Sequence, residues 1–215
     1  MNIFCHPQVF NGNTLATPVA HLLGVEPSAK PNFGIHPGVP LLSGLKDRTE
    51  IDLQLDDLFV EAKLTETSFQ NAKPRLIERY RDLETVFDLD RLPRKILYSP
   101  TTHPPTEDFS QIEDPADLPD PPPSPILAST PSRTAFHGYQ LIRDALAAYA
   151  SDASFCVLCD ARRHDLIETW YAVLLAVHRP TFAARLKLLT WQELAITLPH
   201  DLQQFLDTKY GIVAI

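Results

Sequence analysis

Residues 50–63 decide the fold of this chain, and they read Glu-Ile-Asp-Leu-Gln-Leu-Asp-Asp-Leu-Phe-Val-Glu-Ala-Lys. Two short runs of alternating apolar residues flank an Asp-Asp pair, which is typical of a turn. The first run carries Asp52, and the second carries Glu61 and Lys63. Successive side chains of a strand point to opposite faces, so Glu61 and Lys63 share one face. If the two runs pair as a hairpin, Asp52 comes close to the same patch.

The second run is too apolar for an exposed strand, which predicts burial on both faces. An exposed hairpin, with its charges in surface pairs worth about 0–1 kcal/mol, is the alternative. Buried charges need partners or a metal, because an unpaired buried charge is costly. Two carboxylates and one ammonium group suit a hard divalent cation and a polarised water. The apolar residues of this run are Leu58, Phe59, Val60, Ala62 and Leu64.

This Asp…Glu-x-Lys hairpin resembles the core of the PD-(D/E)XK nuclease superfamily, in particular a bacterial, restriction-endonuclease-like branch. The resemblance also rests on the stretches 48–52, 60–66, 139–143 and 155–163. It implies an α/β fold with a mixed central sheet flanked by helices, of the αβββαβ type. Ile51 stands where the motif's name has proline, and proline there contributes backbone shape rather than chemistry.

The resemblance further implies roles for individual residues. Asp52 and Glu61 are expected to bind Mg²⁺, for which Mn²⁺ can substitute, with the Ala62 carbonyl completing the shell. Lys63 is expected to orient or deprotonate the attacking water. Gln140, early in a later helix, is expected to help position substrate, with an ordinary exposed polar residue as the alternative.

Further acids and several arginines are additional candidates. Glu50 precedes Asp52 by two residues and is a third ligand candidate, and Glu26 follows the first predicted helix. Two adjacent arginines after a strand can clamp phosphates, or they can pair with Asp160 and Asp165 instead. For Arg75 and Arg79, a solvated helix face with acidic neighbours is the alternative. The residues expected to contact DNA phosphates are Arg48, Arg75, Arg79, Arg162 and Arg163.

Composition describes one globular domain of 215 residues with an acidic, proline-rich insertion at about 99–133. Residues 99–132 hold ten of the twenty prolines, and residues 99–133 carry a net charge of −5. The whole chain carries −8, which opposes DNA binding, but only −3 remains outside the insertion. Three cysteines and the lack of a visible signal peptide or membrane span predict a cytoplasmic protein.

The remaining sequence alternates between helices and strands, with a loop-rich stretch at 27–44 that has room for a short strand. Cys156 and Cys159 form a C-x-x-C within a predicted strand, where they face opposite sides and favour core packing over metal binding. We expect helices at 13–23, 69–83, 134–150, 165–177, 191–198 and 201–210, and strands at 155–159 and 185–190.

These features predict a metal-dependent endonuclease that hydrolyses DNA, with a homodimer possible. A nuclease-like fold that no longer cleaves, and that serves as a DNA- or protein-binding module, is the alternative. The acidic balance and the proline-rich insertion favour that alternative, and the intact triplet disfavours it. Hydrolysis of another phosphodiester, such as RNA, is a third possibility.

Overall fold

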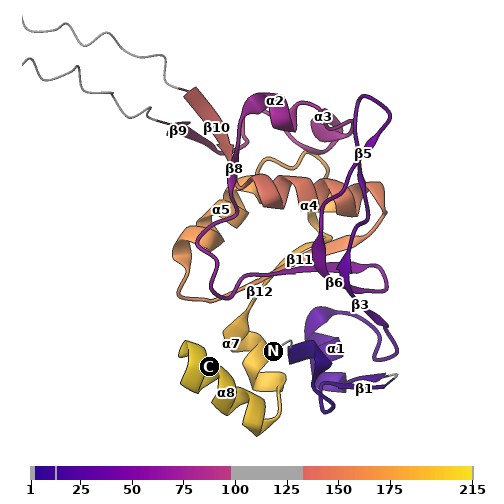
Figure 1. Cartoon of the computed structure of the whole chain (residues 1–215), viewed down its shortest axis with the longest axis vertical. Coiled ribbons are helices and arrows are strands. Elements are labelled where there is room, and N and C mark those ends of the chain that lie inside the picture. The colour runs from indigo at the N-terminus through magenta and orange to yellow at the C-terminus, as the bar shows by residue number, and fades with distance from the viewer. Residues whose placement is uncertain (1–2, 13, 98–132, 215) are drawn as a thin grey trace, which may run out of the picture.

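A five-stranded mixed sheet forms the centre of the molecule (Figure 1). The computed structural model describes residues 3–12, 14–97 and 133–214. Its strand order is β12-β11-β7-β6-β3. The strands are β3 (Pro31–Ile35), β6 (Ile51–Leu55), β7 (Leu58–Ala62), β11 (Ser154–Cys159) and β12 (Leu186–Thr190).

The expected hairpin is formed by β6 and β7, which pair antiparallel around the Asp56-Asp57 turn. Asp56 takes the left-handed conformation with φ 51°, which aspartate tolerates better than most residues. Four of the five β7 residues are buried, because the strand lies in the sheet interior with helices on both faces. The prediction of a strand buried on both sides is confirmed.

The other half of the sheet is parallel. β7 pairs in parallel with β11, which pairs in parallel with β12, while β6 lies antiparallel to β3. Helix α4 (Tyr139–Ala150) connects β7 to β11, as a parallel crossover requires. With α1 (Thr17–Leu23) in front, the order α1-β3-β6-β7-α4-β11 confirms the expected αβββαβ core.

Helices cover both faces of the sheet, and each layer encloses its own apolar cluster (Figure 1). One face packs on α4 and α5 (His164–Leu174), and the other on α1, α7 (Trp191–Thr197) and α8 (His200–Tyr210). Cys159 belongs to the first cluster and Cys156 to the second. Opposite strand faces therefore separate the two thiols, and the core-packing interpretation of the C-x-x-C is confirmed.

Shorter elements surround this core. A three-stranded sheet, β8-β10-β9, lies beside the amino end of α4, and two small hairpins pair β1 with β2 and β4 with β5. The elements are the 3₁₀ helix η1 (Ile3–Cys5), β1 (Phe10–Asn11), β2 (Thr14–Leu15), β4 (Val39–Pro40), β5 (Lys46–Asp47), β8 (Asn71–Ala72), α2 (Pro74–Ile77), α3 (Leu83–Val86), β9 (Arg94–Leu97), β10 (Arg133–His137) and α6 (Pro180–Ala183).

The expected helix at 69–83 is wrong. The chain instead forms β8 and two one-turn helices, α2 and α3. Pro74 lacks an N–H group and holds the preceding residue in an extended conformation, so a helix can begin there but not continue through it. The carbonyls of Phe69 and Gln70 accept hydrogen bonds from the backbone N–H groups of residues 138–140, which tie the segment before β8 to the start of α4.

The helix expected at 134–150 begins at Tyr139, so its first five residues were assigned to the wrong element. Residues 133–137 form β10 and pair with β9 and β8. Gly138 separates the strand from the helix with φ 74°, a left-handed conformation that glycine adopts at no steric cost. Similarly, residues 14 and 15 of the expected 13–23 helix belong to β2, and Pro18 stands in the first turn of α1.

The later elements agree with expectation to within a few residues, and the loop-rich stretch contains β3 and β4. The proline-rich insertion at about 99–133 lies outside the described residues except for Arg133, which begins β10. The backbone partner of Arg133 is Leu97, so both ends of the insertion leave from one strand pair. No helix among the described residues is both long and apolar enough to cross a membrane.

Candidate metal and nucleic-acid site

Glu61, Lys63 and Gln140 meet inside the molecule, at the end of the β6–β7 hairpin. Lys63 Nζ lies 2.8 Å from Glu61 Oε1, and both side chains are buried. Gln140 Nε2 donates a hydrogen bond to the same carboxylate oxygen from the first turn of α4. Strand β7 carries Glu61, and Lys63 follows it by two residues and supplies the ammonium group. Helix α4, which connects β7 to β11, supplies the Gln140 amide.

Asp52 approaches this group from β6. The β6–β7 ladder ends at the pair Leu53 and Val60, and Asp52 lies just beyond it. Its Oδ2 atom accepts a hydrogen bond of 2.8 Å from the Ala62 backbone N–H. The structure thus brings together five of the sequence-predicted site residues: Asp52, Glu61, Ala62, Lys63 and Gln140.

The two carboxyl groups hold protons more strongly than free side chains do. Burial, and secondarily the charge of Asp52, raise the pKa of Glu61 to about 7, although Lys63 favours the ionised form. Partial burial also raises the pKa of Asp52, against the hydrogen bond from Ala62 and the charge of Lys63. A site that makes ionisation costly gains from any bound cation that neutralises the carboxylates.

Lys63 is fixed from several sides. Its backbone N–H donates to the Leu158 carbonyl at 2.7 Å, and its carbonyl accepts a hydrogen bond of 2.9 Å from the Trp191 indole. Its ammonium group lies 5.8 Å from the centre of the Phe69 ring. Trp191 was not among the residues expected at the site, because nothing in the sequence connects a residue so far along the chain to the hairpin.

A second buried acid lies behind the site, and sequence reasoning missed it. Asp144 is fully buried on α4, one turn after Gln140, and accepts a hydrogen bond of 2.9 Å from the Thr49 hydroxyl. Its Oδ2 atom and Gln140 Oε1 are buried without a hydrogen-bond partner among the described residues. Burial, and then the charge of Glu61, raise the pKa of Asp144 well above its ordinary range. The spacing of four residues from Gln140 was the available sequence signal.

The donor set fits a small divalent cation. Asp52 Oδ1 and Glu61 Oε2 have no hydrogen-bond partner among the described residues, so each carboxylate keeps one oxygen for a ligand. The described residues contain no group of three or more His, Cys, Asp or Glu side chains placed to hold a metal. Mg²⁺ is commonly bound by one or two carboxylates, with waters and substrate phosphates completing its shell, so two acids are enough.

The other candidate acids lie further out. Glu50 is exposed, and its charge is the smallest of those that raise the pKa of Asp52. Glu26 is exposed in the turn after α1 and is not among the charges that shift Asp52 or Glu61. The structure therefore brings Glu50 to the edge of the site and leaves Glu26 outside it.

Two of the expected phosphate-binding arginines are engaged in structural contacts. Arg162 pairs with Asp160 at 2.5 Å and donates to the Tyr210 carbonyl. Arg163 pairs with Asp165 at 2.7 Å and donates to the carbonyls of residues 66 and 67, which braces the segment after β7. These are the acidic partners that the sequence offered as the alternative to phosphate.

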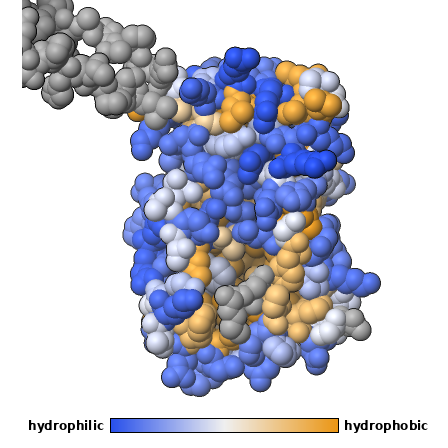
Figure 2. All heavy atoms as spheres, in the orientation of Figure 1, coloured by the Kyte–Doolittle hydropathy of each residue, from blue (hydrophilic) through white to orange (hydrophobic). Residues whose placement is uncertain are grey.

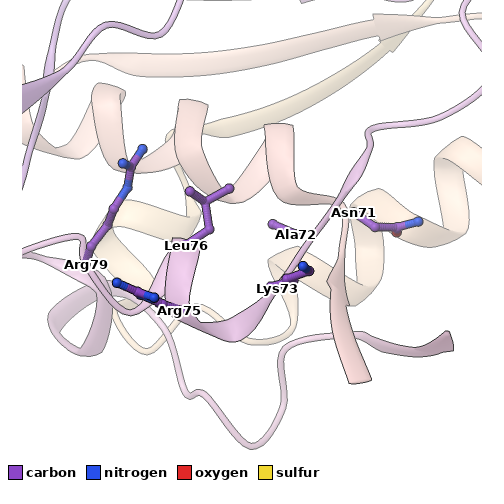
Figure 3. A pocket seen from close by; sticks show the side chains of 6 residues that line it. All are labelled: Asn71, Ala72, Lys73, Arg75, Leu76 and Arg79. Atoms are coloured by element: carbon purple, nitrogen blue, oxygen red, sulfur yellow. The ribbon is translucent and has the colours of Figure 1, made fainter. Parts of the chain in front are cut away.

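A basic hollow of about 690 Å³ lies along β8 and α2 (Figure 3). Lys73, Arg75 and Arg79 line it together with Asn71, Ala72 and Leu76. Arg79 is tied to Asp47 at 2.6 Å, whereas Lys73 and Arg75 have no acidic partner among the described residues. Arg48, on the segment between β5 and β6, is exposed and likewise lacks an acidic partner in the described part of the chain.

The order of the core elements and the hairpin triplet define a restriction-endonuclease-like protein. The chain belongs to the family described as "Restriction Endonuclease associating with ARP" (REase-ARP), whose profile matches residues 1–211. This match confirms the resemblance inferred from the hairpin. No curated protein and no solved structure matches the chain.

Proposed function

We propose that this protein is a metal-dependent endonuclease that hydrolyses DNA phosphodiester bonds. One observation carries the proposal: Asp52, Glu61 and Lys63 from the hairpin segment and Gln140 from α4 converge at the end of that hairpin. The family, described as a restriction endonuclease, supports a nuclease-like fold and DNA as the substrate.

Asp52 and Glu61 would hold Mg²⁺ through their two uncommitted oxygens, with the Ala62 carbonyl as a further ligand and Glu50 as a candidate third acid. When bound, Mg²⁺ supplies Lewis-acid chemistry, polarising the scissile phosphodiester and stabilising the charge on the leaving oxygen. The chain's own residues supply the orientation. Gln140 and Lys63 both donate to Glu61 Oε1, which leaves the other oxygen available to bind the ion.

Lys63 would act on the attacking water and on the phosphate charge. A buried ammonium group beside a phosphodiester offsets its negative charge, and in a dry site this effect is large. Glu61 holds the ammonium group in place at 2.8 Å. The ammonium form would help to position the water that attacks phosphorus, whereas deprotonation of that water by Lys63 would require the neutral amine.

DNA phosphates would contact the basic residues outside this centre. Lys73 and Arg75 in the hollow of Figure 3, together with Arg48, have guanidinium or ammonium groups that no acid neutralises among the described residues. Three other arginines would contribute less to phosphate binding, because each already pairs with an acid. These pairs are Arg79 with Asp47, Arg162 with Asp160 and Arg163 with Asp165.

Cleavage of supercoiled plasmid with Mg²⁺, Mn²⁺ or a chelator tests the proposal. We expect nicking or linearisation with either metal and none with the chelator. Competition between DNA and RNA for the metal-loaded protein separates a deoxyribonuclease from an RNA hydrolase. DNA binding without cleavage of plasmid, branched or single-stranded DNA would support the non-cleaving module, which the net charge of −8 favours.

A further inference from the structure

A second hollow lies on the opposite side of the hairpin from Gln140. It has a volume of about 240 Å³, and Asp52 and Ala62 form part of its wall. The remaining wall is apolar and rich in aromatic rings, formed by Ile3, Phe4, Leu53, Val60, Leu64, Trp191, Phe205 and Tyr210. Apolar side chains gather in this part of the molecule, around α1 and α7 (Figures 1 and 2).

The hollow shares Asp52 and Ala62 with the proposed metal site, whereas Glu61, Lys63 and Gln140 do not line it. Asp52 Oδ2 is bonded to the Ala62 N–H at 2.8 Å, and both residues border the hollow. Trp191, which also lines the hollow, donates its indole N–H to the Lys63 carbonyl. A ligand bound in the hollow would therefore lie next to a cation bound by the Asp52 carboxylate.

The outer wall combines aromatic faces with positive charge. Phe205 and Tyr210 of α8 are half-buried and lie edge to face, 6.0 Å apart. Lys209 Nζ lies 5.4 Å from the first ring and 5.1 Å from the second. Arg162, more than half exposed, reaches the end of α8 through the Tyr210 carbonyl. Rings that can stack on a flat ligand thus lie beside the Lys209 ammonium group, which can bind phosphate.

We infer that this hollow binds an unpaired nucleobase of the strand that is cut, an inference that rests on the proposed nuclease activity. Aromatic rings stack on nucleobases, and adjacent cations follow the sugar-phosphate backbone. A base within a duplex is stacked and cannot enter such a hollow without being extruded. The site is therefore shaped for DNA that has an unpaired nucleotide beside the scissile phosphate, such as a bulge, a flap or a single strand.

The test compares two DNA probes that carry the fluorescent base 2-aminopurine, one in an unpaired bulge and one in a perfect duplex. Binding is measured with Ca²⁺, so that cleavage does not intervene. We expect the wild-type protein to prefer the bulge and to change the emission of its unpaired base. Phe205→Ala and Tyr210→Ala should each weaken bulge binding on the order of tenfold, while duplex binding stays the same.

Two further variants separate stacking from folding. Phe205→Leu keeps apolar packing but removes the ring, so it should also lose the preference for the bulge. Tyr171→Ala removes an aromatic side chain that is half-exposed on α5 and does not line the hollow, so the preference should remain. Equal affinity for the two probes, or unchanged emission on binding, would leave the hollow to another occupant and overturn the inference.

Cleavage of the same two DNAs with Mg²⁺ distinguishes failure of the inference from failure of the proposed function. Equal cleavage of bulge and duplex would overturn the inference and leave the nuclease standing. A change in emission on the bulge with no cleavage of either DNA would support the hollow as a base-binding site and contradict the nuclease.

Discussion

At the scale of single residues, the site depends on polar groups that are buried together. Four polar side chains there are nine-tenths or more buried: Glu61, Lys63, Gln140 and Asp144. Each makes a hydrogen bond, but Gln140 Oε1 and Asp144 Oδ2 have no hydrogen-bond partner among the described residues. Removing one side chain of a buried hydrogen-bonded pair leaves the other without a hydrogen bond, which costs free energy of folding. Replacing it with a neutral side chain of the same shape retains most of the contacts. This difference makes the role of Asp144 testable.

Asp144→Ala should cost about 1–3 kcal/mol of unfolding free energy, because it leaves the buried Thr49 hydroxyl without an acceptor. Asp144→Asn keeps that acceptor and removes a charge that burial already disfavours, so it should cost less than the alanine variant. Urea denaturation of both variants measures the difference. Equal losses would contradict a hydrogen-bonding role for Asp144.

Protons and metal compete for Glu61. Its raised pKa, about 7, means that the folded protein binds more protons than the unfolded chain between pH 4.5 and 7. The metal-free protein therefore loses stability from this group as pH rises through that window. A cation needs the ionised form, so its stabilising effect should show the opposite trend.

We expect the increase in Tm caused by Mg²⁺ to be small at about pH 5.5 and to grow as pH rises through about 7. Thermal melts with and without Mg²⁺ at a series of pH values measure this. Asp52→Asn should remove most of the increase at every pH. An increase that is the same at all pH values would place the ion away from Glu61.

At the scale of elements, the chain reveals its strands better than the starts of its helices. The β6–β7 hairpin is readable because both runs are apolar and a turn sequence separates them. The sequence predicts a helix for residues 134–137 because Phe136 and Tyr139 have helical spacing, which a strand followed by a helix also produces. The pairing of β10 with β9 decides between them, and that contact is not visible in local sequence.

The site was predictable to a similar extent. The triplet of Asp52, Glu61 and Lys63 follows from one hairpin, and Gln140 follows from the resemblance to a family. Trp191 and Thr49 could not be foreseen, because each reaches the site through a tertiary contact. Arg162 and Arg163 were equally open to two interpretations until their acidic partners were located.

Gly138 sets the position of α4 and hence of Gln140. It has φ 74°, and a Cβ atom there would lie 3.0 Å from Thr169 and 3.2 Å from Val173 on α5. Gly138→Ala should therefore destabilise the protein by about 1–3 kcal/mol. Gly44→Ala is the matched control, since φ is 82° but nothing lies within 4 Å. Chemical denaturation should show the larger loss at Gly138, and equal losses would remove the packing argument.

At the scale of the whole molecule, charge limits how DNA is held. The chain carries −8, and several of its arginines are already paired with acids. A single domain with an inserted segment, and a possible homodimer, remain predictions. The charge distribution implies that few phosphates are contacted, with the catalytic cation supplying part of the attraction.

We expect DNA affinity to fall with salt at a log–log slope shallower than about −4, which corresponds to fewer than about five phosphates. Arg75→Ala should make the slope shallower by about one. Arg185→Ala is the control, because Asp152 already neutralises that arginine and no change is expected. Binding measured across a salt series decides this, and a slope near −8 would contradict it.

The most direct test of the central claim is plasmid cleavage by Lys63→Met, with Lys30→Met as the control. Methionine keeps the apolar stem of the buried lysine and removes its charge, whereas Lys30 is an exposed lysine outside the site. We predict roughly 100-fold or greater loss of Mg²⁺-dependent cleavage at Lys63 and none at Lys30. Cleavage that survives unchanged in folded Lys63→Met would contradict the hairpin as the catalytic site.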